Sequence, residues 1–179
     1  MPKSSKSKVT DSENKVIEEL KKDSSKSVDT IAKEFGFSRQ KVWRIKKQLE
    51  SNKTIWGYSA VIDEEKRGYT NYIILIKFSN GSLDDKLVDS IIEGKLKDII
   101  TDANDVNIES DFFVYGQYDW VLSIHAKDVI QAKKFCESLN ILCEGQLEKI
   151  DILENVCNIR KNWILNPDNK SKQTLKYII

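Results

Sequence analysis

One stretch of the sequence carries side chains suited to contact a nucleic acid. Successive residues of an α-helix are about 100° apart, so a helix over residues 39–51 places Gln40, Trp43, Arg44 and Lys47 on one face. Lys and Arg neutralise phosphates, whereas Gln and Arg can make paired hydrogen bonds to base edges in the major groove. We expect this face to read bases. The alternative is a solvated basic helix with its indole tucked against a neighbour.

Other cations of the same helix flank that face, and their main role is expected on phosphates. Together with the outward face, they give the candidate DNA-binding residues, which are Arg39, Gln40, Lys41, Trp43, Arg44, Lys46 and Lys47.

The positioning of this helix depends on its opposite side and on two helices before it. Val42, Ile45 and Leu49 form the predicted buried stripe, and Ser38 is a suitable N-cap. A preceding helix, with the apolar spacing of Val28, Ile31, Ala32 and Phe35, is expected to end at Gly36, because glycine accepts a left-handed conformation. A first helix begins at Thr10 or Asp11 and carries Val16, Ile17 and Leu20. Two helices joined by a tight turn predict a helix-turn-helix.

Charge is divided unevenly along the 179 residues. Residues 1–56 hold 14 basic and 8 acidic residues, a net charge of +6, and residues 158–179 hold 5 and 1, a net charge of +4. Residues 57–157 hold 10 and 19, a net charge of −9. A basic head joined to an acidic body indicates two surfaces with different partners, although Lys-rich ends also serve solubility alone.

Several classes of protein are disfavoured by composition. No apolar run approaches the roughly 18 to 20 residues needed to span a bilayer, and residues 1–8 do not resemble a secretory signal. The three cysteines, Cys136, Cys143 and Cys157, form no CxxC pair, which favours a reduced, cytoplasmic protein.

The chain lacks the usual motifs of cofactor and metal chemistry. The spacing of the cysteines and of His125 matches no common zinc pattern, so we predict no metal site. Neither GxxxxGK[ST] nor GxGxxG occurs, so we predict no phosphate-cradling loop, no cofactor and no catalytic residue.

The acidic body alternates between strand and helix patterns. Strands are expected over residues 55–62, 72–78, 106–114, 120–126 and from 150, the last one reaching as far as Trp163. Helical spacing runs from Leu83 to Ile99, with a weak spot at Gly94, and again over residues 128–142. The order after the first strand is β-α-β-β-α-β, which predicts a ferredoxin-like sheet with both helices on one face.

The other face of that sheet has no cover within the chain. A second copy of the sheet would bury it, so we expect a homodimer. The side chains expected on this face are Phe113, Tyr115, Val121, Leu153 and Trp163.

The chain resembles the Lrp/AsnC, or feast/famine, group of transcription regulators over about residues 10–163. In the head the resemblance is carried by Ile31-Ala32-Lys33-Glu34-Phe35-Gly36-Phe37-Ser38 and by the helix after it. It continues through Ile55-Trp56-Gly57-Tyr58-Ser59-Ala60 and Gly116-Gln117-Tyr118-Asp119. The implied fold class is α+β, with an N-terminal helix-turn-helix, winged-helix-like, joined to a ferredoxin-like βαββαβ RAM domain.

The resemblance also implies a function. Family members bind double-stranded DNA as dimers and often as octamers or other rings of dimers, and the RAM domain commonly senses an amino acid. The Gly-x-Tyr-Asp loop helps to form that pocket, so Gly116, Tyr118 and Asp119 are the candidate effector-binding residues. A glycine lets backbone N–H groups approach a carboxylate, and an aspartate can hold an ammonium. The alternative is that this loop is only a hairpin turn capped by its aspartate.

One departure from the family bears on the effector. Many members have a Thr-x-Thr pattern at the start of the last strand, where this chain has Lys149 and Asp151. Charges in place of hydroxyls indicate a different ligand or none. The other functions left open are a DNA-packaging protein of low sequence specificity and a siroheme-decarboxylase-like enzyme.

These patterns, together with what the resemblance implies, predict five segments. They are a disordered basic N-terminus (1–9), a DNA-binding domain (10–56), a hinge strand and linker (57–70), an effector-binding and oligomerisation domain (71–163) and a basic tail (164–179).

Overall fold

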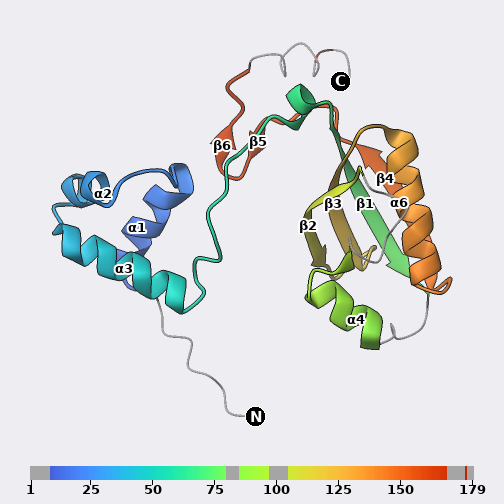
Figure 1. Ribbon diagram of the computed structural model, residues 1–179, viewed down its shortest axis with the longest axis horizontal. Coiled ribbons are helices and arrows are strands. Elements are labelled where there is room, and N and C mark those ends of the chain that lie inside the picture. Colours follow the sequence, from blue (N-terminus) through green and yellow to red (C-terminus); the bar gives the residue numbers. More distant parts are fainter. Residues whose placement is uncertain (1–8, 80–84, 97–104, 169–175, 177–179) are drawn as a thin grey trace. The chain divides into compact units, whose positions relative to one another are not determined.

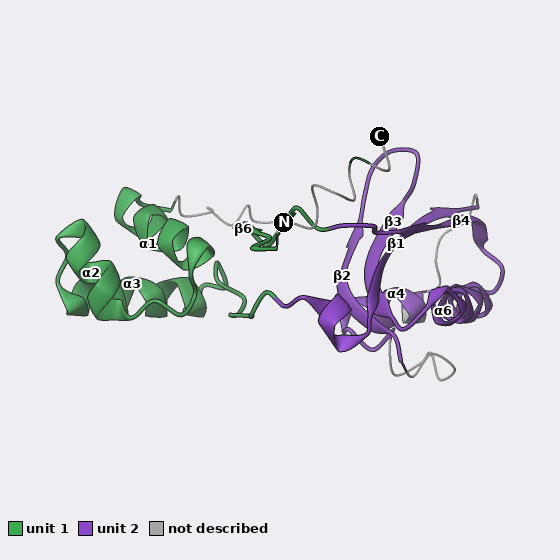
Figure 2. Cartoon of the chain, turned by 90° about the horizontal axis from the view of Figure 1, so that it is seen from above, with its two compact units in different colours: residues 1–61, 158–179 green, residues 62–157 purple. Residues whose placement is uncertain are grey.

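The chain folds into two compact units. A computed structural model describes residues 9–79, 85–96, 105–168 and 176. One unit, the head, comprises residues 1–61 with 158–179, and the other, the body, comprises residues 62–157 (Figure 2). Residues 1–8, which were expected to be disordered, lie outside the described residues, as does most of the basic tail.

The head contains the three expected helices (Figure 1). They are α1 (Asp11–Lys22), α2 (Val28–Phe35) and α3 (Arg39–Ser51). Each begins at a hydroxyl N-cap, which accepts a hydrogen bond from a backbone N–H that the first turn leaves unpaired. The caps are Thr10, Ser27 and Ser38.

The turn between α2 and α3 depends on Gly36. Its φ of 63° and ψ of 29° are left-handed, and Phe37 N–H donates to Ala32 C=O at 2.9 Å. This closure reverses the chain within two residues, so that α3 begins directly after it. The apolar stripes of the three helices then meet in one core, formed by Val16, Leu20, Ile31, Ala32, Val42, Ile45 and Leu49.

A buried carboxylate ties α1 to α2. Glu19 is only 3% exposed and binds the ammonium groups of Lys22 and Lys26. Lys26 also reaches Glu34 of α2 at 3.2 Å. The hydrogen bonds from the two lysines lower the pKa of Glu19 from 4.5 to about 2. The carboxylate is therefore charged whenever the head is folded near neutral pH.

The body is a four-stranded antiparallel sheet covered on one face by helices (Figure 2). Its elements are β1 (Thr70–Phe78), α4 (Asp85–Ile92), β2 (Asn107–Phe113), β3 (Trp120–Ala126), α6 (Val129–Leu142) and β4 (Leu147–Glu154). The strand order β2-β3-β1-β4 and the single covered face confirm the ferredoxin-like prediction. A short 3₁₀ helix, η1 (Glu64–Arg67), precedes β1.

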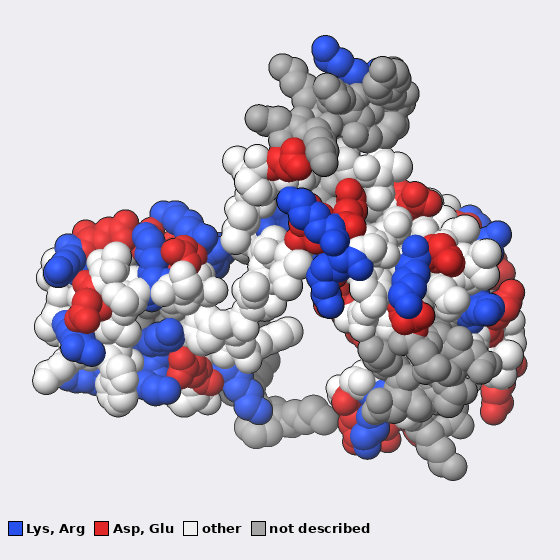
Figure 3. Space-filling view, turned by 45° about the horizontal axis from the view of Figure 1, so that its top comes forward, with Lys and Arg blue, Asp and Glu red and all other residues white. Residues whose placement is uncertain are grey.

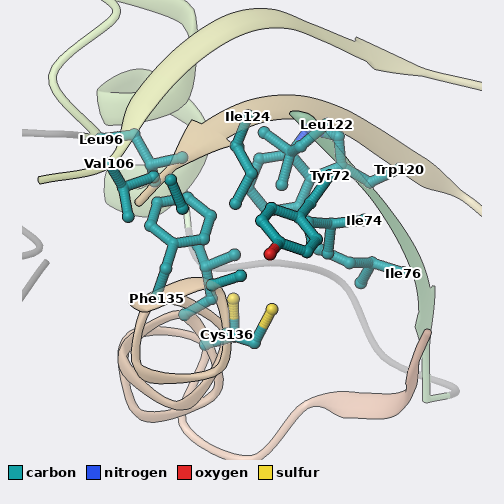
Figure 4. Packing of buried hydrophobic residues seen from close by; sticks show 14 of the residues in the cluster. Tyr72, Ile74, Ile76, Leu96, Val106, Trp120, Leu122, Ile124, Phe135 and Cys136 are labelled. Atoms are coloured by element: carbon teal, nitrogen blue, oxygen red, sulfur yellow. The ribbon is translucent and has the colours of Figure 1, made fainter. Parts of the chain in front are cut away.

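The core of the body lies between the sheet and its helices. Phe135 and Cys136 of α6 point toward Tyr72, Ile74 and Ile124 of the central strands (Figure 4). Trp120 and Leu122 are fully buried in the same cluster. Burial raises the pKa of the Cys136 thiol to about 12, as expected for a core cysteine.

Two strand predictions are wrong. Residues 55–62 form no strand, because nothing in the described chain pairs with them. β4 ends at Glu154 rather than reaching Trp163, and a separate hairpin, β5 (Arg160–Lys161) with β6 (Ile164–Leu165), follows. No strand occurs between α3 and β1 either, so no hairpin wing follows α3 directly.

Two of the residues predicted on the uncovered face of the sheet, Phe113 and Trp163, do not lie there. The register of β2 against β3 shifts between Ile108 and Ser110, and Phe113 pairs with the fully buried Trp120. Their rings stack with centroids 5.5 Å apart, so Phe113 belongs to the helix-covered side. Phe112, opposite Val121, takes its place and is 50% exposed. Trp163 belongs to the head hairpin and not to the sheet.

Apolar side chains pair across the strands at the centre of the uncovered face. Ile73 pairs with Leu153, and Leu75 pairs with Val121. Tyr115 lies beyond the end of β2 and is fully exposed.

The Glu19 network makes head stability depend on acid pH. A carboxyl whose pKa is lowered by folding stabilises the folded state above its unfolded pKa, and this contribution is lost as pH falls through the folded pKa. Wild-type stability should therefore fall between about pH 4.5 and about pH 2 more steeply than that of Glu19→Gln. Urea unfolding followed by helical circular dichroism measures this. Equal pH profiles for the two proteins would contradict the assignment, and Glu18→Gln, on the exposed side of α1, is the matched control.

Candidate nucleic-acid interface and effector loop

The apolar stripe of α3 fixes which of its side chains face outward. Val42, Ile45 and Leu49 are 0%, 9% and 1% exposed. Gln40 and Arg44 point away from that stripe and are exposed, and Trp43 is 55% exposed. An exposed indole between an amide and a guanidinium offers hydrogen bonds, charge and an aromatic face within two helical turns.

The outward side chains of α3 differ in whether they form hydrogen bonds or ion pairs with other residues of the chain. Within the described residues, Gln40 and Arg44 have no side-chain hydrogen bond or ion pair, so both are available to a ligand. Lys47 binds Glu50 at 2.9 Å, and Arg39 Nε lies 3.4 Å from Asp29. These two ion pairs are exposed, where such pairs contribute little to stability, and a phosphate can replace either carboxylate.

The two remaining cations rest on aromatic rings. The ammonium of Lys41 lies 3.9 Å from the Phe37 ring centroid, and that of Lys46 lies 4.5 Å from the Tyr58 ring centroid. Tyr58 in turn donates from its hydroxyl to Glu50 at 3.1 Å. Partial burial and this hydrogen bond raise the pKa of Tyr58 to about 12. The contacts orient both lysines while leaving their charges unpaired.

The surface of the head carries both basic and acidic side chains. Lys and Arg side chains spread over the visible face of the head, with acidic side chains between them (Figure 3). The structure thus brings the seven predicted DNA-binding residues onto one helix, all except the half-buried Lys46 exposed.

The predicted effector loop joins β2 to β3 and is held by Asp119. The Asp119 carboxylate accepts from Lys77 Nζ at 2.9 Å and from Phe78 N–H at 3.0 Å. Its backbone accepts from Val114 N–H at 2.9 Å. The hydrogen bonds from Lys77 and from Phe78 lower the pKa of Asp119. An effector ammonium would therefore compete with Lys77 for this carboxylate.

Tyr118 lies in a second polar cluster on the uncovered side of the sheet. Its hydroxyl donates to Asp151 Oδ2 at 2.5 Å and accepts from Lys149 Nζ at 3.4 Å. Lys149 and Asp151 pair with each other at 2.7 Å. The two residues that depart from the Thr-x-Thr pattern thus contact a candidate effector residue directly.

Gly116 is exposed, and nothing inside the described chain requires a glycine there. Its φ is outside the left-handed region, and an added Cβ would meet no atom within 4 Å. Its small size leaves open space above the backbone of the loop.

Lys77 contacts the candidate effector loop, although the sequence pattern did not indicate it. It is the only charged residue in the apolar run of β1, and a charge in such a run usually has a partner. That signal indicates an ion pair but not its distant partner, 42 residues further along the chain.

Two other features, a cluster of metal-binding side chains and a membrane-spanning helix, are absent from the described part of the chain. No group of three His, Cys, Asp or Glu residues there is placed to hold a metal ion. No helix among the described residues is long and apolar enough to cross a membrane.

At the level of sequence, no protein-family model and no curated protein matches the chain. Solved structures do match. LrpC of B. subtilis superposes with a TM-score of 0.64 at 22% identity, covering 86% of this chain and 99% of its own. The leucine response regulatory protein LrpA of Mycobacterium tuberculosis gives 0.67 at 17% identity, covering 86% and 96%.

The chain has the Lrp/AsnC fold. A third match is a transcriptional regulator of Neisseria meningitidis solved in complex with L-Met, with a TM-score of 0.62 at 14% identity over 85% of this chain and 92% of its own. Because the matches span both the helical head and the sheet, the predicted two-domain Lrp/AsnC architecture is confirmed.

The Lys77–Asp119 pair predicts a pH-dependent contribution to body stability. Asp119→Ala should lower the melting temperature at pH 7, because it removes the acceptor that joins β1 to the β2–β3 loop. The deficit should shrink as pH falls through the lowered pKa of Asp119, where the wild-type carboxylate is itself protonated. Thermal unfolding at several pH values measures both effects. Glu148→Ala, which removes an exposed carboxylate of β4, is the control, and a deficit independent of pH would count against the ion pair.

Proposed function

We propose that the protein is a cytoplasmic, sequence-specific DNA-binding transcription regulator of the Lrp/AsnC type, with residues 10–56 as its DNA-binding domain. The observation that carries this proposal is the outward face of α3, where Gln40, Trp43 and Arg44 are exposed opposite a buried stripe. An amide and a guanidinium on a helix that follows a tight turn match the chemistry of major-groove readout.

The remaining candidates of α3 are assigned to the phosphate backbone. Arg39, Lys41, Lys46 and Lys47 lie beside the reading face, and none is locked in a buried ion pair. Phosphate contacts fix the register of a protein on the duplex, whereas base contacts supply specificity.

We propose that the body assembles the regulator as a homodimer through the uncovered face of its sheet. Ile73, Leu75, Phe112, Val121 and Leu153 share this face, and Phe112 and Leu153 are each 50% exposed. Apolar side chains on an open sheet gain stability when a second sheet covers them. A two-fold dimer also presents two copies of α3 to two half-sites.

We further propose that an amino acid or similar small effector binds at Gly116, Tyr118 and Asp119. The open space at Gly116 admits a ligand, and the Lys77–Asp119 and Lys149–Asp151 ion pairs, which include Asp119 and contact Tyr118, supply both signs of charge. Such polar groups complement the carboxylate and ammonium of an amino acid.

Arg44→Ala tests the reading face. The operator is first obtained by selecting bound sites from random DNA. The variant should then bind it more weakly by about 1–3 kcal/mol, because a bidentate guanidinium–base contact is lost. Fluorescence anisotropy at fixed salt gives the affinity.

Arg67→Ala is the matched control, because Arg67 is the one arginine of residues 57–157 and is exposed on η1. Operator affinity that is unchanged in a folded Arg44→Ala protein would remove Arg44 from the reading face. Equal affinity of the wild type for operator and random DNA would instead favour DNA packaging.

Tyr118→Phe tests the effector loop. Removing the hydroxyl leaves the ring but breaks the contacts with Asp151 and Lys149, so the response of operator binding to the activating or inhibiting amino acid should fall. Effector-free binding should stay at the wild-type level. Screening the common amino acids against the wild type identifies the probe, and Tyr69→Phe is the control. If no amino acid alters DNA binding or assembly, the body is an assembly module only.

A further inference from the structure

The β5–β6 hairpin is joined to the head, although it follows the body in the sequence. Residues 158–179 cluster with residues 1–61 and not with the sheet that precedes them. One contact joins the hairpin to α1, where the ammonium of Lys21 lies 3.9 Å from the ring centroid of Trp163. A cation at this distance is attracted to the electron-rich face of an indole.

The hairpin has a defined local structure. Arg160 pairs with Leu165, and Lys161 pairs with Ile164. Asn166 closes the base through its backbone N–H to Ile159 C=O at 3.0 Å and its side chain to Asn158 C=O at 2.8 Å. A short hairpin closed in this way holds its strand residues at fixed positions.

The tip of the hairpin is unusual in composition. Its two turn residues, Asn162 and Trp163, have φ values of 44° and 73°, and positive φ at both positions is what a type I′ hairpin turn requires. Asn suits this conformation, whereas a bulky aromatic residue rarely adopts it. Trp163 is also 67% exposed, so burial does not explain its presence. In this left-handed conformation, the Trp163 ring contacts the ammonium of Lys21.

The charged residues of the hairpin lie on its two opposite faces. Arg160 and Lys161 are neighbours on β5, and successive side chains of a strand point to opposite sides. A hairpin with a cation on each side fits between the two phosphate rows of a DNA groove. The segment 158–179 as a whole carries a net charge of +4, joined to a head segment of +6.

We propose that the β5–β6 hairpin is a second DNA-binding element of the head, in which Arg160 and Lys161 bind phosphates on the two sides of a groove beside the site contacted by α3. The proposal extends the proposed function and depends on it. The hairpin supplies, from the far end of the chain, the kind of wing that is missing directly after α3. Trp163 holds it to α1 through Lys21.

Salt dependence of binding tests the proposal. Each neutralised phosphate contributes about 0.9 to the slope of log affinity against log salt concentration. The double variant Arg160→Ala, Lys161→Ala should therefore bind the selected duplex more weakly, with a slope smaller in magnitude by about 1.8. The full chain is used, and the duplex extends beyond the selected site on both sides.

Two matched variants serve as controls. Arg160→Lys with Lys161→Arg exchanges the side chains but keeps both charges, so it should retain the wild-type slope. Lys133→Ala with Lys134→Ala removes two adjacent exposed cations of α6 and should also leave the slope unchanged.

Trp163→Gly keeps the cations and suits the left-handed turn but removes the contact with Lys21, so part of the affinity should be lost.

The outcomes separate this proposal from the proposed function. If the wild type fails to bind DNA, the proposed function fails. If Arg44→Ala weakens binding but the double alanine variant keeps the wild-type slope, only the hairpin proposal is overturned. A double variant that keeps its slope and loses assembly in sedimentation would assign the hairpin to an acidic surface of a second copy, which also overturns the proposal.

Discussion

Burial of Val42, Ile45 and Leu49 against α1 and α2 is the constraint on which the proposed interface depends. Fully burying an apolar side chain of this size contributes about 1.5–3 kcal/mol, so rotating α3 to hide its polar face would cost several such terms. The rotation of the helix is therefore fixed, and with it the outward direction of Gln40 and Arg44. The left-handed Gly36 sets where the helix begins, since the chain must reverse before Ser38 can cap it.

The polar side chains of the sheet lie mainly on the face that the helices leave uncovered. The helix-covered face is filled by apolar side chains, whereas the open face combines an apolar centre with ion pairs near the β2–β3 loop. The Lys77–Asp119 ion pair and the Tyr118–Asp151 hydrogen bond hold that loop against β1 and β4. The groups that fix the loop are thus also those of the proposed effector site.

The division of charge gives the two units distinct electrostatic roles. A body of −9 repels the phosphate backbone, while a head segment of +6 attracts it, so the charge pattern favours docking of DNA on the head alone. The β5–β6 hairpin adds Arg160 and Lys161 to the head because it clusters with it. Charge that is far from the head in sequence therefore contributes to the same field.

The sequence by itself determined the three head helices, the Ser38 cap and the face of α3, because helix periodicity and capping act over a few neighbouring residues. It also indicated the order of strands and helices in the body. Only the tertiary structure decided that Phe112, and not Phe113, lies on the open face, since the irregular register near Ile108 reverses the alternation after it. It also decided the partner of Lys77 and the place of Trp163. These depend on contacts between residues far apart in the chain, which no local pattern records.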